Sequence, residues 1–212
     1  AAIEASIGFG MNLVVVPVLA LVLPDSLPVV VVLLTIPVST AMLRHEHSDL
    51  DTNGLTWLLG GRIPGSLVGA WIAVSVSVAY LKLAVGSMVL LFVAAALLMP
   101  PIPVRRSTQT VAGAVSGVTG TAAGIGGPPL ALLYQHHAGG PMRSTLAACY
   151  FVGTFLSFAA LAAVGAVAVM QILLALILTP FVLGGAYVGR RSHSWLEQGW
   201  LRPAVLVFSV VS

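Results

Sequence analysis

The residues best suited to chemistry form a glycine- and proline-rich run in the second half of the chain. Between positions 120 and 134 the chain carries Gly124, Gly126 and Gly127, followed directly by Pro128. Proline removes a backbone donor, and glycine costs about 1 kcal/mol relative to alanine within a helix, so this run predicts a broken helix. A break frees N–H groups at the start of the next helical piece, where the helix dipole favours an anion. We therefore expect a small-anion site that is built mostly from backbone.

A shorter form of the same pattern lies near the start of the chain, where Gly8, Gly10 and Asn12 precede Pro17. Two matched breaks that face each other near the middle of a bilayer would enclose the anion. Asn12 is the polar side chain that we expect in such a cavity, because an unpaired amide in lipid is costly. The alternative is that the glycines only let helices pack closely. The Gly-x-Gly-Gly-Pro-Pro run and its partner favour a site.

Arg62 is a candidate for the positive charge of the site. It lies two residues before Pro64 and eight after Gly54, or about 12 Å along a helix. An arginine inside a membrane is costly and usually functional, so it could pair with an anion. The alternative is a shallow arginine whose charged end reaches the lipid headgroups beside Trp57. The sequence leaves both interpretations open.

The composition indicates the elements that hold these residues. Hydrophobic residues make up 58% of the 212 positions and charged residues 7%, with a mean hydropathy of +1.06. A soluble domain has about 25% charged residues. The apolar runs are long and continuous, which favours helices over barrel strands. We therefore predict an all-α polytopic protein of the cell membrane (inner or plasma membrane) that contacts the lipid bilayer. The net charge of +3 is scattered, which argues against nucleic acid as a partner.

The apolar segments repeat. They run over approximately 1–23, 27–43, 54–78, 80–99, 108–134, 143–167, 168–189 and 200–212. Moving the chain along itself by 116 positions superposes glycines and prolines: Gly8 on Gly124, Gly10 on Gly126 and Pro64 on Pro180. We predict two homologous four-segment halves, 1–100 and 108–212, joined by a linker at 101–107, with a Gly/Pro-broken first segment in each half.

The positive charges predict how the halves are oriented. If the broken segments 1–23 and 108–134 enter the membrane and return, the flanking arginines share one side: Arg44, Arg105, Arg106, Arg143, Arg190, Arg191 and Arg202. Lys82 then lies opposite. If all eight segments cross, the charges split without bias. Because Lys and Arg favour the cytoplasmic side, we prefer the first arrangement. It gives each half an odd number of crossings, so the halves are inverted repeats.

The motifs resemble those of a known family. The stretch Gly124-Ile125-Gly126-Gly127-Pro128-Pro129-Leu130 resembles the second-half signature of the TauE/SafE family, the sulfite exporter-like permeases. Gly8-Phe9-Gly10 with Pro17 resembles the first-half signature, although Met11 and Asn12 stand where further glycines are common. Arg143 and the stretches 64–69 and 180–185 are similar too. The resemblance implies transport of small sulfur-containing anions, such as sulfite, sulfoacetate or related organosulfonates.

These observations favour a secondary transporter, because the chain has no Gly-x-x-x-x-Gly-Lys-Ser/Thr loop for ATP. The alternatives are a non-catalytic membrane assembly subunit and an intramembrane enzyme, and the second lacks nucleophile and metal motifs. We expect no catalytic residue, no cofactor and no metal, since His45-Glu46-His47 has no further ligands nearby. Partners are the small anionic substrate and lipid, and association into a homo-oligomer stays open. The predicted substrate-binding residues are Gly8, Gly10, Asn12, Arg62, Gly124, Gly126, Gly127 and Pro128.

Overall fold

The computed structural model of the chain describes residues 28–45, 50–98, 100, 102–135 and 140–191. These residues form seven helices and, within these ranges, no strand: α2 (Val29–His45), α3 (Thr52–Ser75), α4 (Val78–Leu98), α5 (Arg106–Ala123), α6 (Pro128–Tyr134), α7 (Gly140–Ala163) and α8 (Val169–Arg191). The helical fold is as predicted, and the helix bounds follow the six central apolar segments. Segments 1–23 and 200–212 lie outside the described residues, and so do Gly8, Gly10 and Asn12.

Helix ends follow local capping chemistry. The Asp51 carboxylate caps α3 by accepting a hydrogen bond from the Gly54 amide at 3.0 Å. The Thr108 hydroxyl accepts one from the Arg105 amide at 2.9 Å, at the start of α5. The same helix ends at Gly124, whose φ of 74° is the left-handed conformation that glycine adopts most easily. Gly124 is thus the first residue of the break that the sequence predicted.

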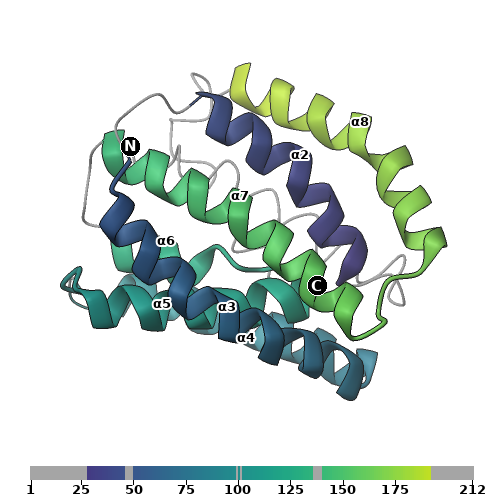
Figure 1. Cartoon of the computed structure of the whole chain (residues 1–212), viewed down its shortest axis with the longest axis horizontal. Coiled ribbons are helices and arrows are strands. Elements are labelled where there is room, and N and C mark those ends of the chain that lie inside the picture. The colour runs from purple at the N-terminus through teal and green to yellow at the C-terminus, as the bar shows by residue number, and fades with distance from the viewer. Residues whose placement is uncertain (1–27, 46–49, 99, 101, 136–139, 192–212) are drawn as a thin grey trace.

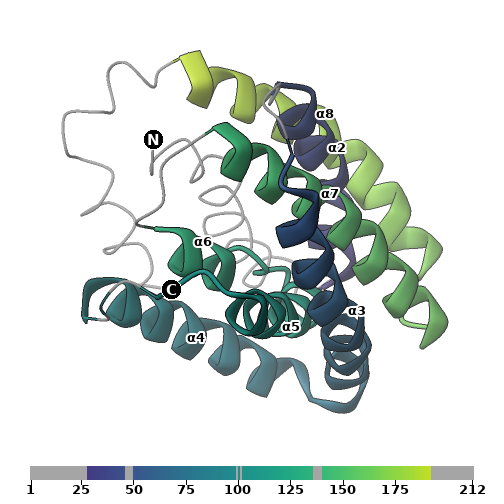
Figure 2. The same ribbon diagram turned by 60° about the vertical axis from the view of Figure 1, so that its left-hand side comes forward.

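Glycines bring α3 and α5 into backbone contact. A methyl group placed on Gly61 would meet the carbonyl of Thr110, and one on Gly113 would meet the carbonyl of Leu58. Gly65 and Gly117 are equally close to the opposite helix. Small residues allow such an approach in membrane bundles. The alternative interpretation of glycine therefore holds for this pair of helices, which lie together in Figure 2.

A second group of helices lies beside this pair. Figure 1 shows α2 between α7 and α8, and α2 contacts both. Its apolar face packs against α8 through Val30, Leu34 and Ala175. Another cluster joins α2 to α7, and it includes Val32 and Leu161. The helix α7 also contacts α3, so it connects the two groups.

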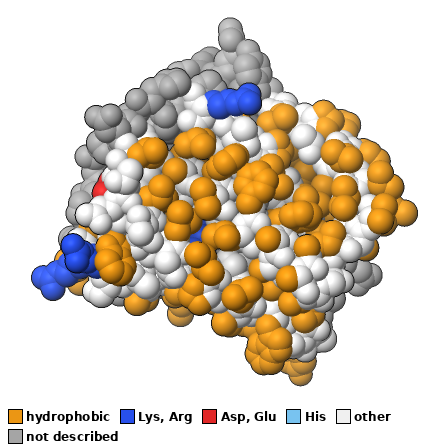
Figure 3. All heavy atoms as spheres, viewed as in Figure 1, with side chains coloured by type: hydrophobic (Ala, Val, Ile, Leu, Met, Phe, Trp, Pro, Cys, Tyr) orange, Lys and Arg blue, Asp and Glu red, His pale blue; other side chains and the backbone are white. Residues whose placement is uncertain are grey.

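The outer surface is apolar. Hydrophobic side chains cover much of the face in Figure 3, and most of the visible Lys and Arg atoms lie toward its margin. Trp71 on α3 is 65% exposed and Phe181 on α8 is 73% exposed. Two stretches, Thr52–Ser75 and Met142–Ala163, are long and apolar enough to cross a membrane, and α2 and α8 contain shorter apolar stretches. A water-soluble surface rarely exposes so much apolar area, whereas lipid suits it.

The helix bounds fit the predicted offset of 116 positions. Moved by that offset, α3 covers 168–191, where α8 runs from Val169 to Arg191, and α2 covers 145–161, within α7. By this offset α8 corresponds to α3 and α7 corresponds to α2. The contact between α3 and α7 therefore corresponds to the contact between α8 and α2, and the structure contains both. The inverted relation of the complete halves stays a prediction, because the counterparts of α4 and of the α5–α6 segment lie largely outside the described residues.

Candidate anion site at a broken helix

The segment that contains α5 and α6 turns back on itself. Four residues, 124–127, separate the two helices. Near the start of α5, the Gln109 amide donates to the Tyr134 hydroxyl at the end of α6, at 3.0 Å. Halfway along α5, the Ser116 hydroxyl donates to the Gly126 carbonyl. Because the end of α6 returns to the start of α5, this segment reverses direction, which is the shape that the preferred arrangement of charges requires. Its entry into the membrane from one side stays a prediction.

The break offers fewer backbone donors than the sequence predicted. The Gly124 amide donates to the Gly120 carbonyl at 3.1 Å, and the Ile125 amide donates to the Thr119 carbonyl at 3.2 Å. Pro128, at the first position of α6, has no N–H, and neither has the proline after it. The remaining amides at the break are those of Gly126 and Gly127. A side chain must therefore provide most of the positive charge.

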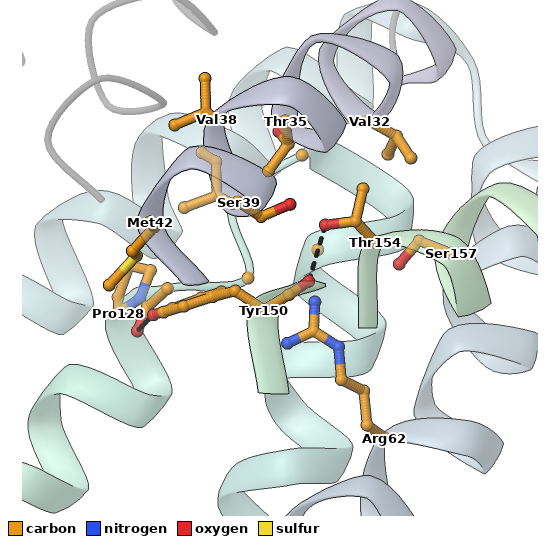
Figure 4. Close-up of a pocket in the computed structure, with 15 residues that line it drawn as sticks. Val32, Thr35, Val38, Ser39, Met42, Arg62, Pro128, Tyr150, Thr154 and Ser157 are labelled. Carbon is orange, nitrogen blue, oxygen red and sulfur yellow. Dashed lines mark hydrogen bonds between the residues drawn. The ribbon is translucent and has the colours of Figure 1, made fainter. Parts of the chain in front are cut away.

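A cavity of about 40 Å³ lies at the break. Gly124, Gly126, Gly127 and Pro128 line it on one side, together with Arg62 from α3. The opposite side belongs to α2 and α7, which contribute hydroxyl and apolar side chains (Figure 4). A water molecule needs a cavity of roughly 10–15 Å³, so this one has room for a small ion.

Arg62 points into this cavity. Its side chain is 3% exposed, and Nη1 donates to the Ser116 hydroxyl at 3.0 Å. The guanidinium carbon lies 5.9 Å from the centre of the Tyr150 ring, and Nε has no hydrogen-bond partner among the described residues. The side chain passes over Gly153, where a methyl group would collide with the guanidinium. Arg62 is thus buried and does not reach outward. The arginine beside Trp57 is Arg106, at 5.6 Å.

No acidic side chain among the described residues balances this charge. The one acidic residue within the described ranges is Asp51, which caps the start of α3. It precedes Arg62 by eleven positions, or about 16 Å along the helix. A buried ion without a partner costs several kcal/mol. The cavity therefore has a positive charge that a bound anion can neutralise.

Two carbonyl oxygens at the break accept hydrogen bonds from hydroxyl groups. The Ser116 hydroxyl accepts from Arg62 and donates to the Gly126 carbonyl. The Tyr150 hydroxyl donates to the Gly127 carbonyl at 3.1 Å. Carbonyl oxygens repel anions, so these bonds make the site more favourable to negative charge.

Sequence reasoning missed the polar side chains of α2 and α7. Thr35, Ser39 and Met42 on α2 line the cavity, as do Tyr150, Thr154 and Ser157 on α7. Each set follows spacings of four and three residues, which places its members on one face of a helix. Hydroxyl side chains at these spacings, two on α2 and three on α7, are the signal that could have predicted them, whereas Met42 has none. No such spacing marks Ser116, because it lies 54 positions from Arg62 in the sequence and meets it only in the folded chain.

The structure brings Arg62 of the first half together with the predicted residues of the second half. Gly124, Gly126, Gly127, Pro128 and Arg62 meet at one cavity, although they come from separate elements. Their role in binding stays a prediction. Gly8, Gly10 and Asn12 were predicted on the other side of the site, and they lie outside the described residues.

Apolar helices around a reversing, glycine-broken segment are typical of helical membrane transporters. The chain matches the model of the sulfite exporter TauE/SafE family over residues 1–212, and it belongs to that family. This confirms the resemblance seen in the motifs. The family comprises membrane transporters of the sulfite exporter type. No curated protein and no solved structure matches the chain.

Proposed function

We propose that the chain is a secondary transporter that binds small sulfur-containing anions, such as sulfite or organosulfonates, in the cavity at the α5–α6 break. One observation carries the proposal. Arg62 is buried, points into the cavity and has no acidic partner among the described residues. A sulfur oxyanion supplies the missing charge and accepts hydrogen bonds from the guanidinium. The amides of Gly126 and Gly127 lie beside it as further donors.

The position of the cavity supports transport as its purpose. One wall belongs to the α3–α5 pair, in which glycines hold the two backbones together. The other wall belongs to α2 and α7. Movement of one wall relative to the other would open the cavity first to one side of the membrane and then to the opposite side. With inverted halves in the inner or plasma membrane, both open states follow from the same scaffold.

Sulfite uptake tests the role of Arg62. The full chain is placed in lipid vesicles, and the initial rate of radiolabelled sulfite uptake is measured. We expect Arg62→Gln to reduce transport about 100-fold, because a hydrogen bond to a charged group contributes about 3 kcal/mol and 1.4 kcal/mol is a factor of ten. Arg106→Gln is the matched control. It makes the same chemical change on an exposed side chain beside Trp57, and the rate should persist.

Three results of this assay would contradict the proposal. Uptake that Arg62→Gln leaves unchanged would remove the site from this cavity. Equal losses in both variants would indicate a general effect of positive charge rather than binding. Vesicles with folded protein that move neither sulfite nor an organosulfonate would exclude this substrate class.

A further inference from the structure

The charge of the cavity indicates the charge of its ligand. Among the described residues that line it, Arg62 is the one with a charged side chain. A ligand with one negative charge neutralises it. A second negative charge in the same buried space lacks a partner among these residues, and an unpaired buried charge is costly. The site should therefore favour an anion with a single charge.

The hydroxyls opposite Arg62 add a second requirement. Ser39 on α2 donates to the Ile36 carbonyl at 3.0 Å, and Thr154 on α7 donates to the Tyr150 carbonyl at 2.8 Å. Both hydroxyl protons are thus used within the helices. The oxygens can still accept a hydrogen bond through their lone pairs. Figure 4 shows Ser39 and Thr154 on neighbouring helices, on the side of the cavity toward which the Arg62 guanidinium points.

Ser157 differs from these two hydroxyls. It accepts a hydrogen bond from Thr121 at 2.8 Å, so its own proton remains for a ligand. The cavity then has donors in Arg62 and Ser157, and acceptors in Ser39 and Thr154. A ligand that fits this pattern carries negative oxygens together with one group that donates.

From these observations, and on the basis of the proposed function, we infer that the site selects anions with a single negative charge and a hydrogen-bond donor. Sulfite meets this description in its singly protonated form, HO–SO2⁻. A dianion of the same size, such as sulfate, brings an unpaired charge and no donor. Methanesulfonate, a sulfonate with one negative charge, meets the charge requirement but has no hydrogen-bond donor.

Competition at one fixed pH tests the inference without titrating the protein. Radiolabelled sulfite uptake into vesicles is measured with sulfamate, methanesulfonate or sulfate present outside. Sulfamate has one charge and N–H donors, methanesulfonate has one charge and no donor, and sulfate has two charges. We expect sulfamate to inhibit at a concentration about tenfold lower than sulfate, equivalent to about 1.4 kcal/mol, because sulfate has an unpaired charge and lacks the donor. Methanesulfonate, which lacks only the donor, should lie between them.

A matched pair of variants isolates the acceptor. Thr154→Val keeps the shape of the side chain and removes one of the two acceptor oxygens, so the difference between inhibition by sulfamate and inhibition by methanesulfonate should become smaller. Thr179→Val makes the same change on α8, where the hydroxyl also donates one turn back, to the Ala175 carbonyl at 2.7 Å, and this residue does not line the cavity. Here the difference between the two inhibitors should persist.

The outcomes separate this inference from the proposed function. Sulfite uptake that sulfate inhibits as strongly as sulfamate overturns the single-charge rule and leaves the proposed function intact. Equal inhibition by sulfamate and methanesulfonate in the unmodified protein overturns the donor requirement, and a difference that Thr154→Val leaves unchanged overturns the assignment of Thr154 as an acceptor. Folded protein that takes up neither sulfite nor an organosulfonate overturns the proposed function, and the inference falls with it.

Discussion

The helices α3 and α8 correspond to each other at an offset of 116 positions in the sequence, but their residues differ at the positions that form the site on α3. Each contains a proline at the matched position, Pro64 or Pro180. Gly61 in α3 is buried against the backbone of α5. Its counterpart in α8 is Ile177, which is 63% exposed. The bulky Ile177 side chain excludes a comparable backbone contact at this position. Its exposed apolar surface suits contact with lipid, whereas Gly61 of α3 contacts another helix.

The same comparison applies to the charge. The counterpart of Arg62 is Leu178, which packs against the apolar cluster between α2 and α8. Where α3 presents a cation to a cavity, α8 presents an aliphatic side chain to a core. The scaffold of the two helices is similar, but only α3 carries the features of a binding site. The two helices correspond in position and differ in the residues that would bind an anion.

The largest effect should come from filling the α3–α5 contact. Gly61→Ala places a methyl group against the backbone of α5, which cannot move aside. We expect the free energy of unfolding to fall by roughly 3 kcal/mol, the upper range for overpacking. Thermal unfolding of the purified protein in detergent measures it. Gly60→Ala is the control, because its methyl group meets nothing within 4 Å and replaces a glycine in a helix. It should stabilise by up to about 1 kcal/mol.

A smaller effect should follow from moving Arg62. Gly153→Ala puts a methyl group where the guanidinium passes, and the arginine, being flexible, can shift while the helices stay in place. We expect the KM for sulfite to rise about tenfold, equivalent to about 1.4 kcal/mol, with the unfolding temperature nearly unchanged. Gly184→Ala on α8, whose added methyl group meets nothing, should leave both values unchanged. An unchanged KM in Gly153→Ala would mean that the position of Arg62 is irrelevant to binding.

The smallest of the three effects should come from Ser116. Ser116→Ala removes the hydroxyl that joins Arg62 to the Gly126 carbonyl, while Arg62 stays in the cavity. We expect the KM to rise about fivefold and the maximal rate to persist, since one hydrogen bond contributes about 1 kcal/mol. Ser87→Ala on α4 is the control, because that hydroxyl is exposed and bonds only to its own helix. Equal effects in both variants would exclude a positioning role for Ser116.

Much of the fold was predictable because lipid leaves few options. Long apolar runs must be helices, and Gly124 and Pro128 mark the ends of two of them. Arg62 attracted attention because a charge in an apolar run is costly. The sequence could not decide whether it reaches inward or outward. The direction of the Arg62 side chain depends on Gly153, which leaves room for the guanidinium, and on Ser116, which accepts its hydrogen bond. Both residues lie on other helices, and no sequence pattern links them to Arg62.

The backbone contribution to the site was overestimated for a similar reason. The prediction counted the break as a source of free amides. Gly124 and Ile125, however, bond back to α5, and Pro128 has no N–H to offer. Glycines also proved to have two roles: those at 124–127 form the break, whereas Gly61 and Gly113 bring helices together. Residue type alone does not distinguish these roles, because they depend on what lies opposite each glycine.

The central claim is that the anion binds beside Arg62 at the α5–α6 break. Selenite, a heavier analogue of sulfite with the same shape, makes this visible. A structure of the full chain with selenite, recorded at the selenium absorption edge, should show one anomalous peak between the Arg62 guanidinium and the Ser157 hydroxyl. The peak should be absent in Arg62→Gln. A peak elsewhere in the protein, or a peak that survives the loss of Arg62, would contradict the account.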